Sequence, residues 1–185
     1  MLIMGMIDYK HKMLKAVLEN YVDEDVLIVG PMGIYGSFDL EMPSRHKFLR
    51  YHSDTEYTCE RHPNFAGDFY YDKKLSLLGI SCCSIFLSLS QFRTNLANKW
   101  IDNRPRIVVS PFLDIDDYQD PHDANKVQHE KNVIKDLMKV HKPEIWISSH
   151  NSGISVKNMK RNGITYNVLG KLVCASKLDD FMTIL

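Results

Sequence analysis

The chain has 185 residues, which fits a single domain, 1–185, with a sizeable core. Hydrophobic residues make up 44% and charged residues 25%, which excludes an intrinsically disordered chain. The 23 basic and 23 acidic residues balance, so composition gives no general attraction to nucleic acid or to an anionic membrane. No apolar stretch is long enough to span a bilayer, and the start lacks the parts of a secretion signal.

The four cysteines are Cys59, Cys82, Cys83 and Cys174, and no two of them form a CxxC pair. Cys82 and Cys83 stand inside an apolar run, where a thiol behaves as a small hydrophobic group. We therefore expect reduced core thiols in a cytoplasmic protein, rather than a disulfide framework or a zinc site.

The first third of the chain predicts two strands and a helix, followed by a polar region. Residues 2–4 form a short strand, and residues 10–21 carry apolar side chains at helical spacing. Residues 25–29 are a continuous apolar run that predicts a buried strand, stopped by a Gly-Pro pair. Residues 30–62 are polar and rich in turn residues, and no element is predicted there.

The middle of the chain alternates strands with helices. Apolar runs predict strands at 75–84, 106–110 and 145–147, and the apolar residues of 86–101 fit one face of a helix. Asp123 or Asn125 caps a second helix that runs to about residue 140.

The last part of the chain, 154–174, predicts short antiparallel strands. Asn162-Gly163 is a typical two-residue hairpin turn between them. Strands that alternate with helices and finish in a hairpin predict a layered α/β domain, with a β-sheet core flanked by helices.

The segment PEIWISSHNSGISVKNMKRNGITYNVLG resembles the C-terminal signature of the calcineurin-like metallophosphoesterases. In that family a strand ends in Gly-His-x-His, and a hairpin then leads the chain away. Here Ser149-His150-Asn151-Ser152 occupies this position. His150 matches the first histidine of the motif, whereas Ser152 stands where the second would be.

Two further segments resemble family strands but lack the family's ligands. RIVVSPFLD resembles the strand that ends in a histidine-containing turn, yet Pro111 and Phe112 stand at the turn. VLIVGPMGIYGS resembles the strand that carries Gly-Asn-His-Asp/Glu. Gly30 is kept there, and Pro31-Met32-Gly33 replaces the amide, the imidazole and the acid.

The first residues, LIMGMIDYKHK, resemble the strand that carries Gly-Asp, with Gly5 and Asp8 nearby. The family's opening Asp-x-His strand has no counterpart. The resemblance therefore implies a metallophosphoesterase-like fold truncated at the N-terminus. It extends over nearly the whole chain in layout and is most specific at 26–37 and 106–170.

Dimetal hydrolysis in this family needs two divalent ions that bind phosphate oxygens and activate a hydroxide. Methionine is a poor ligand for Mn²⁺ or Mg²⁺, and proline, phenylalanine and glycine side chains offer no donor. We therefore expect no resident cofactor. If the protein is active, Mn²⁺ or Mg²⁺ would be held by Asp8, His150, Asp114 and Asp116, with His150 as the catalytic residue.

Two other clusters allow metal binding but favour simpler interpretations. The acidic run 114–123 suits a hard cation, although its spacing excludes an EF-hand, and a solvated loop before a helix is favoured. His46, His52 and His62 flank Cys59, but without zinc-finger spacing each is interpreted as a surface-loop histidine. A hydrogen bond from His150 to nearby backbone is as good an interpretation as a ligand role.

Three functions follow, and the first is favoured. In the first, which the resemblance implies, the chain is a catalytically degenerate phosphoesterase fold that acts as a protein-binding or inhibitory module, a role compatible with a viral or phage origin. Its candidate contact surface is aromatic, and packing of these rings against the sheet is the competing interpretation. That surface comprises Tyr51, Tyr57, Phe65, Phe69, Tyr70 and Tyr71.

The second function is a metal-dependent phosphoesterase that hydrolyses phosphodiesters or nucleotides with a rearranged site. The third is a nucleic-acid-binding domain, against which the charge balance argues. Its basic residues would be Arg45, Lys47, Arg50, Lys157, Lys160 and Arg161.

Overall fold

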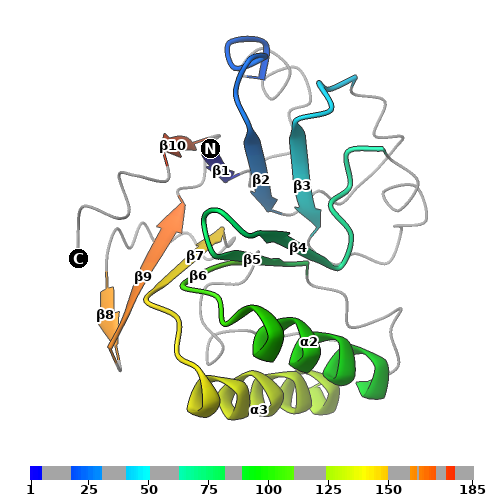
Figure 1. Cartoon of the computed structure of the whole chain (residues 1–185), viewed down its shortest axis with the longest axis vertical. Coiled ribbons are helices and arrows are strands. Elements are labelled where there is room, and N and C mark those ends of the chain that lie inside the picture. Colours follow the sequence, from blue (N-terminus) through cyan, green and yellow to red (C-terminus); the bar gives the residue numbers. More distant parts are fainter. Residues whose placement is uncertain are drawn as a thin grey trace.

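A computed structural model describes residues 1–5, 18–30, 41–50, 63–81, 89–110, 124–149, 159–161, 163–169 and 174–177. These residues form ten strands and two long α-helices (Figure 1). The strands are β1 Leu2–Gly5, β2 Val26–Gly30, β3 His46–Arg50, β4 Phe69–Asp72, β5 Leu77–Ile80, β6 Ile107–Ser110, β7 Ile145–Ser149, β8 Met159–Arg161, β9 Ile164–Leu169 and β10 Cys174–Lys177. The helices are α2 Leu89–Asn103 and α3 Ala124–Val140.

The strands build two mixed sheets. Sheet A has the order β10-β1-β2-β3, in which β1, β2 and β3 run parallel and β10 is antiparallel to β1. Sheet B has the order β4-β5-β6-β7-β9-β8, with four central parallel strands and an antiparallel strand at each edge. Each sheet therefore gathers the carboxyl ends of its parallel strands along one edge.

The two sheets pack face to face. Apolar side chains from β1, β2 and β3 form one buried cluster with side chains from β5, β6 and β7. Gly79 lies at a point of close approach, because a Cβ there would stand 2.9 Å from Leu49 Cδ1. A side chain at Gly79 would force the Leu49 side chain to move within the layer between the sheets, which favours a glycine at this point of close approach.

The outer face of sheet B is covered by α2 and α3, which lie side by side (Figure 1). Trp100 of α2 and Trp146 of β7 are fully buried at this interface, together with Leu137 of α3. The Trp100 indole donates a hydrogen bond to the His141 carbonyl at 2.9 Å, so its polar edge is satisfied.

The outer face of sheet A carries a third cluster. Met4, Ile28 and Phe48 are buried there with Leu18, and Tyr21 packs against them. Residues 18–19 are helical and residues 20–21 form a turn, so the helix expected at 10–21 ends two residues early; residues 10–17 lie outside the described residues. Layers of helices and sheets confirm the α/β class.

Most expected elements of the middle and end of the chain are confirmed, with bounds shifted by a few residues. The hairpin turn is confirmed because Arg161 pairs with Ile164 and Gly163 has a φ of 78°. Strands β3, β4 and β10 were not expected. Within the described residues, neither helix is long and apolar enough to cross a membrane.

Candidate functional site

The four candidate site residues, Asp8, Asp114, Asp116 and His150, lie outside the described residues. Three described strands precede them in the sequence. Asp8 follows β1, the two later aspartates follow β6, and His150 is the next residue after β7. The assignment of these residues to a site therefore stays a prediction. The structure describes only the ends of the strands that precede them.

The carboxyl ends of β6 and β7 are adjacent. The two strands are parallel neighbours, and Ser110 pairs with Ser148 in the register. Strand β2 packs across the sandwich against both of them. The chain thus leaves β6 and β7 from neighbouring points, an arrangement that suits a site built from loops at the ends of parallel strands.

The described residues at these ends are small and weakly coordinating. Gly5 ends β1 and Gly30 ends β2, and neither has a side-chain donor. The buried Ser110 hydroxyl of β6 accepts a hydrogen bond from the Trp146 indole at 2.8 Å. None of these three described residues offers the carboxylate or imidazole that Mn²⁺ and Mg²⁺ favour.

Sequence reasoning did not single out the buried serines at these ends. Ser81 follows β5, and its hydroxyl donates to the Gly67 carbonyl at 2.8 Å. Ser110 and Ser148 are likewise buried. The sequence signal that could have indicated them is a small polar residue at the end of an apolar run. Their hydroxyls take part in the hydrogen bonding of the fold.

No group of three or more histidine, cysteine, aspartate or glutamate side chains is placed to hold a metal ion within the part of the chain that the structure describes. Among the zinc candidates, only His46 is described. It is not a surface-loop residue as expected: it is the first residue of β3 and is fully buried. His46 is buried because β3 pairs with β2 and the outer face of β3 packs against Tyr21.

His46 and Asn64 close the amino end of β3. His46 Nε2 donates a hydrogen bond to the Tyr21 carbonyl at 2.8 Å, while Nδ1 is buried without a partner. The Asn64 amide donates to the carbonyls of Pro43 and His46 at 2.8 and 2.7 Å. These contacts hold the loop before β3 against the following chain, which gives His46 a structural role.

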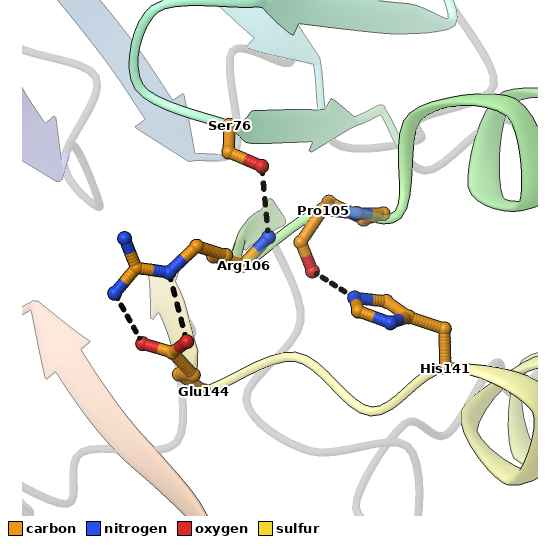
Figure 2. A network of polar contacts seen from close by, with 5 residues as sticks. All are labelled: Ser76, Pro105, Arg106, His141 and Glu144. Atoms are coloured by element: carbon orange, nitrogen blue, oxygen red, sulfur yellow. Dashed lines mark hydrogen bonds and ion pairs between the residues drawn. The ribbon is translucent and has the colours of Figure 1, made fainter.

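The amino ends of the parallel strands of sheet B are joined by a continuous polar row. Backbone hydrogen bonds link Ser76 to Arg106, Arg106 to Glu144, and Glu144 to Thr165. Figure 2 shows the side chains at this edge: the Arg106 guanidinium pairs with both carboxylate oxygens of Glu144, at 2.8 and 2.7 Å. His141 Nε2 donates to the Pro105 carbonyl at 3.0 Å.

This ion pair shifts the ionisation of both partners. Hydrogen bonds from Arg106 lower the pKa of Glu144, and the same bonds raise the pKa of Arg106. Both side chains are about half exposed, at 52% and 42%, so water screens the pair. The pair links the residues that immediately precede β6 and β7 at the edge of the sheet. Its exposure and mutual neutralisation give no sign of a reactive group.

The described members of the aromatic surface are half-buried rather than free. Phe69 and Tyr71 pack against the cluster under the helices, and Tyr70 packs against the cluster between the sheets. Phe65 contacts Phe48, with ring centroids 5.5 Å apart. Burial is also the main cause that raises the pKa of Tyr70. Packing against the core accounts for these four rings, and Tyr51 and Tyr57 lie outside the described residues.

Comparison with known proteins identifies no relative: no family model, no curated protein and no solved structure matches the chain.

Proposed function

We propose that this chain has a calcineurin-like metallophosphoesterase scaffold that has lost most of its metal ligands and acts as a protein-binding or inhibitory module. The support for the scaffold is the motif resemblance together with two face-to-face mixed sheets and helices outside one of them. A module of this kind would act through its surface and would need no resident cofactor.

The observation that carries the proposal is the chemistry of the strand ends. In the family the ligands follow parallel strands, and here β1, β2 and β6 end in Gly5, Gly30 and Ser110. The next residues after β2 and β6 are Pro31 and Pro111, which have no side-chain donor. A dimetal centre would need several ligands at these points.

The test is hydrolysis of a generic phosphodiester with added Mn²⁺, by the wild type and by His150→Ala. The proposal predicts that both proteins match the protein-free blank. A rate above the blank that is abolished by His150→Ala would contradict it. A partner is then sought by affinity capture and accepted only if it co-elutes with the purified chain at a fixed stoichiometry.

One observation favours the alternative, a metal-dependent phosphoesterase with a rearranged site. Because β6 and β7 end side by side, the segments that carry Asp114, Asp116 and His150 begin at neighbouring points. Asp8 would complete the set with Mn²⁺ or Mg²⁺. In that case Asp114→Asn and His150→Ala should each abolish turnover and reduce bound metal together, whereas the lost-site proposal predicts no change in either.

A further inference from the structure

The amino-terminal edge of sheet B carries a row of exposed basic side chains. The four turns along it lead into β5, β6, β7 and β9. Ser76, Arg106 and Glu144, which the backbone row links, stand immediately before β5, β6 and β7. The exposed basic residues on these turns are Lys73, Lys74, Arg104, Arg106 and Lys142. Arg161, which ends β8, stands at the same edge in the register.

The sheet fixes the spacing of this row. Neighbouring strands lie about 4.8 Å apart, so the edge from β5 to β9 is about 14 Å long. The turns are held in place: Asp72 accepts hydrogen bonds from the Lys74 and Leu75 amides at 2.9 and 3.1 Å. The Arg104 amide donates to the Trp100 carbonyl at 2.8 Å with a φ of 43°, which closes the end of α2.

Five basic side chains lie on this edge, against three acidic ones, Asp72, Asp102 and Glu144, so the edge has an excess of positive charge. Glu144 is engaged by Arg106, and one oxygen of Asp72 accepts the turn amides. Asp102 is exposed at the end of α2. Within the part of the chain that the structure describes, no acidic side chain forms an ion pair with Lys73, Lys74 or Arg104. A neutral chain therefore carries a locally basic edge.

We infer that this edge binds the phosphodiester backbone of duplex nucleic acid, independently of sequence. A row of cations on turns whose backbone is held, about 14 Å long, spans the axial rise of about four base pairs at 3.4 Å per step. The exposed large hydrophobics among the described residues are Val22, Ile101 and Val140. None is aromatic, so the edge offers neither a base-stacking platform nor the aromatic anchors of a membrane-surface helix.

This surface is separate from the proposed strand-end site. It lies at the amino ends of the parallel strands, whereas the candidate ligands follow the carboxyl ends. Binding here needs no metal, so it should persist in a chelator. A phosphoesterase that held nucleic acid as substrate through bound metal would lose it under the same treatment.

The test measures binding of a fluorescent duplex of about 20 base pairs across a salt series, in a chelator, with a Kd of roughly 1–100 μM expected near physiological salt. The edge variant is Lys73→Gln/Lys74→Gln/Arg104→Asn, in which asparagine suits the positive φ. The control, Lys99→Gln/Lys135→Gln/Lys139→Gln, removes the same charge from exposed positions on α2 and α3.

The slope of log affinity against log salt changes by about 0.9 per phosphate contact, so the edge variant should flatten it by about 2.7. The control should keep the wild-type slope. No duplex binding by the wild type would overturn the inference. An equal loss of affinity in the edge variant and the control would also overturn it, because binding would then depend on overall charge and not on this edge. Retention on phosphatidylserine vesicles without duplex binding would also overturn it.

Discussion

The amino-terminal edges of the two sheets are closed in opposite ways. In sheet A, the buried Asn64 amide and His46 ring bind carbonyls of the loop before β3 and of Tyr21. In sheet B, the backbone row is complete without side chains, and an exposed ion pair between Arg106 and Glu144 is added to it. The side chains at the sheet A edge are therefore buried donors to backbone carbonyls, whereas those at the sheet B edge are exposed charges added to a backbone row.

The two kinds of contact contribute differently to stability. A buried carbonyl that loses its donor costs about 1–3 kcal/mol, because water cannot replace the bond. An exposed ion pair contributes about 0.2–1 kcal/mol, because water and salt screen it. Replacing an exposed charge at the sheet B edge should therefore cost less stability than replacing a buried donor at the sheet A edge.

The largest effect is expected from Asn64→Leu. It keeps the volume but leaves the Pro43 and His46 carbonyls without the amide donor, so unfolding should be easier by about 2–4 kcal/mol. Urea unfolding measures the change. Asn98→Leu, at an exposed position on α2, is the matched control and should stay within about 0.5 kcal/mol of the wild type. Equal losses of stability at both positions would contradict the special role of the buried Asn64 amide.

A smaller effect is expected from His46→Phe. The variant deprives the Tyr21 carbonyl of its donor, but it also removes the partnerless Nδ1 atom. These terms offset, and the loss of stability should be about 1 kcal/mol. Urea unfolding of His46→Phe and Asn64→Leu, measured side by side, ranks the two buried donors of the sheet A edge by their contribution to stability. A loss of stability greater than that of Asn64→Leu would mean that the packing of the His46 ring contributes more to stability than its hydrogen bond.

The smallest effect is expected from the exposed pair. Glu144→Gln and Arg106→Met should each cost about 0.2–1 kcal/mol at low salt, and high salt should reduce the cost. A double-mutant cycle isolates the coupling between the two side chains. A coupling well above this range would show that the sheet B edge does depend on its charges.

The same pair gives a pH dependence of known sign. The pKa of Glu144 is lowered in the folded protein, chiefly by hydrogen bonds from Arg106. Its contribution to stability is therefore complete above the ordinary glutamate value of 4.5 and is lost as pH falls through the lowered folded value. The stability difference between wild type and Glu144→Gln should vanish in acid. A difference that grows in acid would reverse the assignment.

Sequence reasoning found the elements whose apolar residues show a clear pattern. Val26–Gly30, Ile107–Ser110 and the hairpin around Gly163 were predicted because burial and turn chemistry act locally. Strand β3 was missed because HKFLR has only two apolar residues, and its burial comes from distant partners. Strand β10, with the sequence CASK, is defined only by its pairing with β1.

The candidate site could be predicted only in part. The structure gives the strands that lead to it and shows that β6 and β7 end together. Asp8, Asp114, Asp116 and His150 lie outside the described residues, and no local sequence pattern sets the distances between side chains so far apart in the chain. The buried role of His46 was also invisible, because a histidine in a polar run gives no sign of the carbonyl it binds.

The loss of the metal ligands is tested most directly by metal content. The protein is expressed with added Mn²⁺, purified without chelator and subjected to elemental analysis. The proposed function predicts a metal content near that of a buffer blank. About two ions per chain, reduced in His150→Ala, would contradict the lost-site account and favour a dimetal hydrolase.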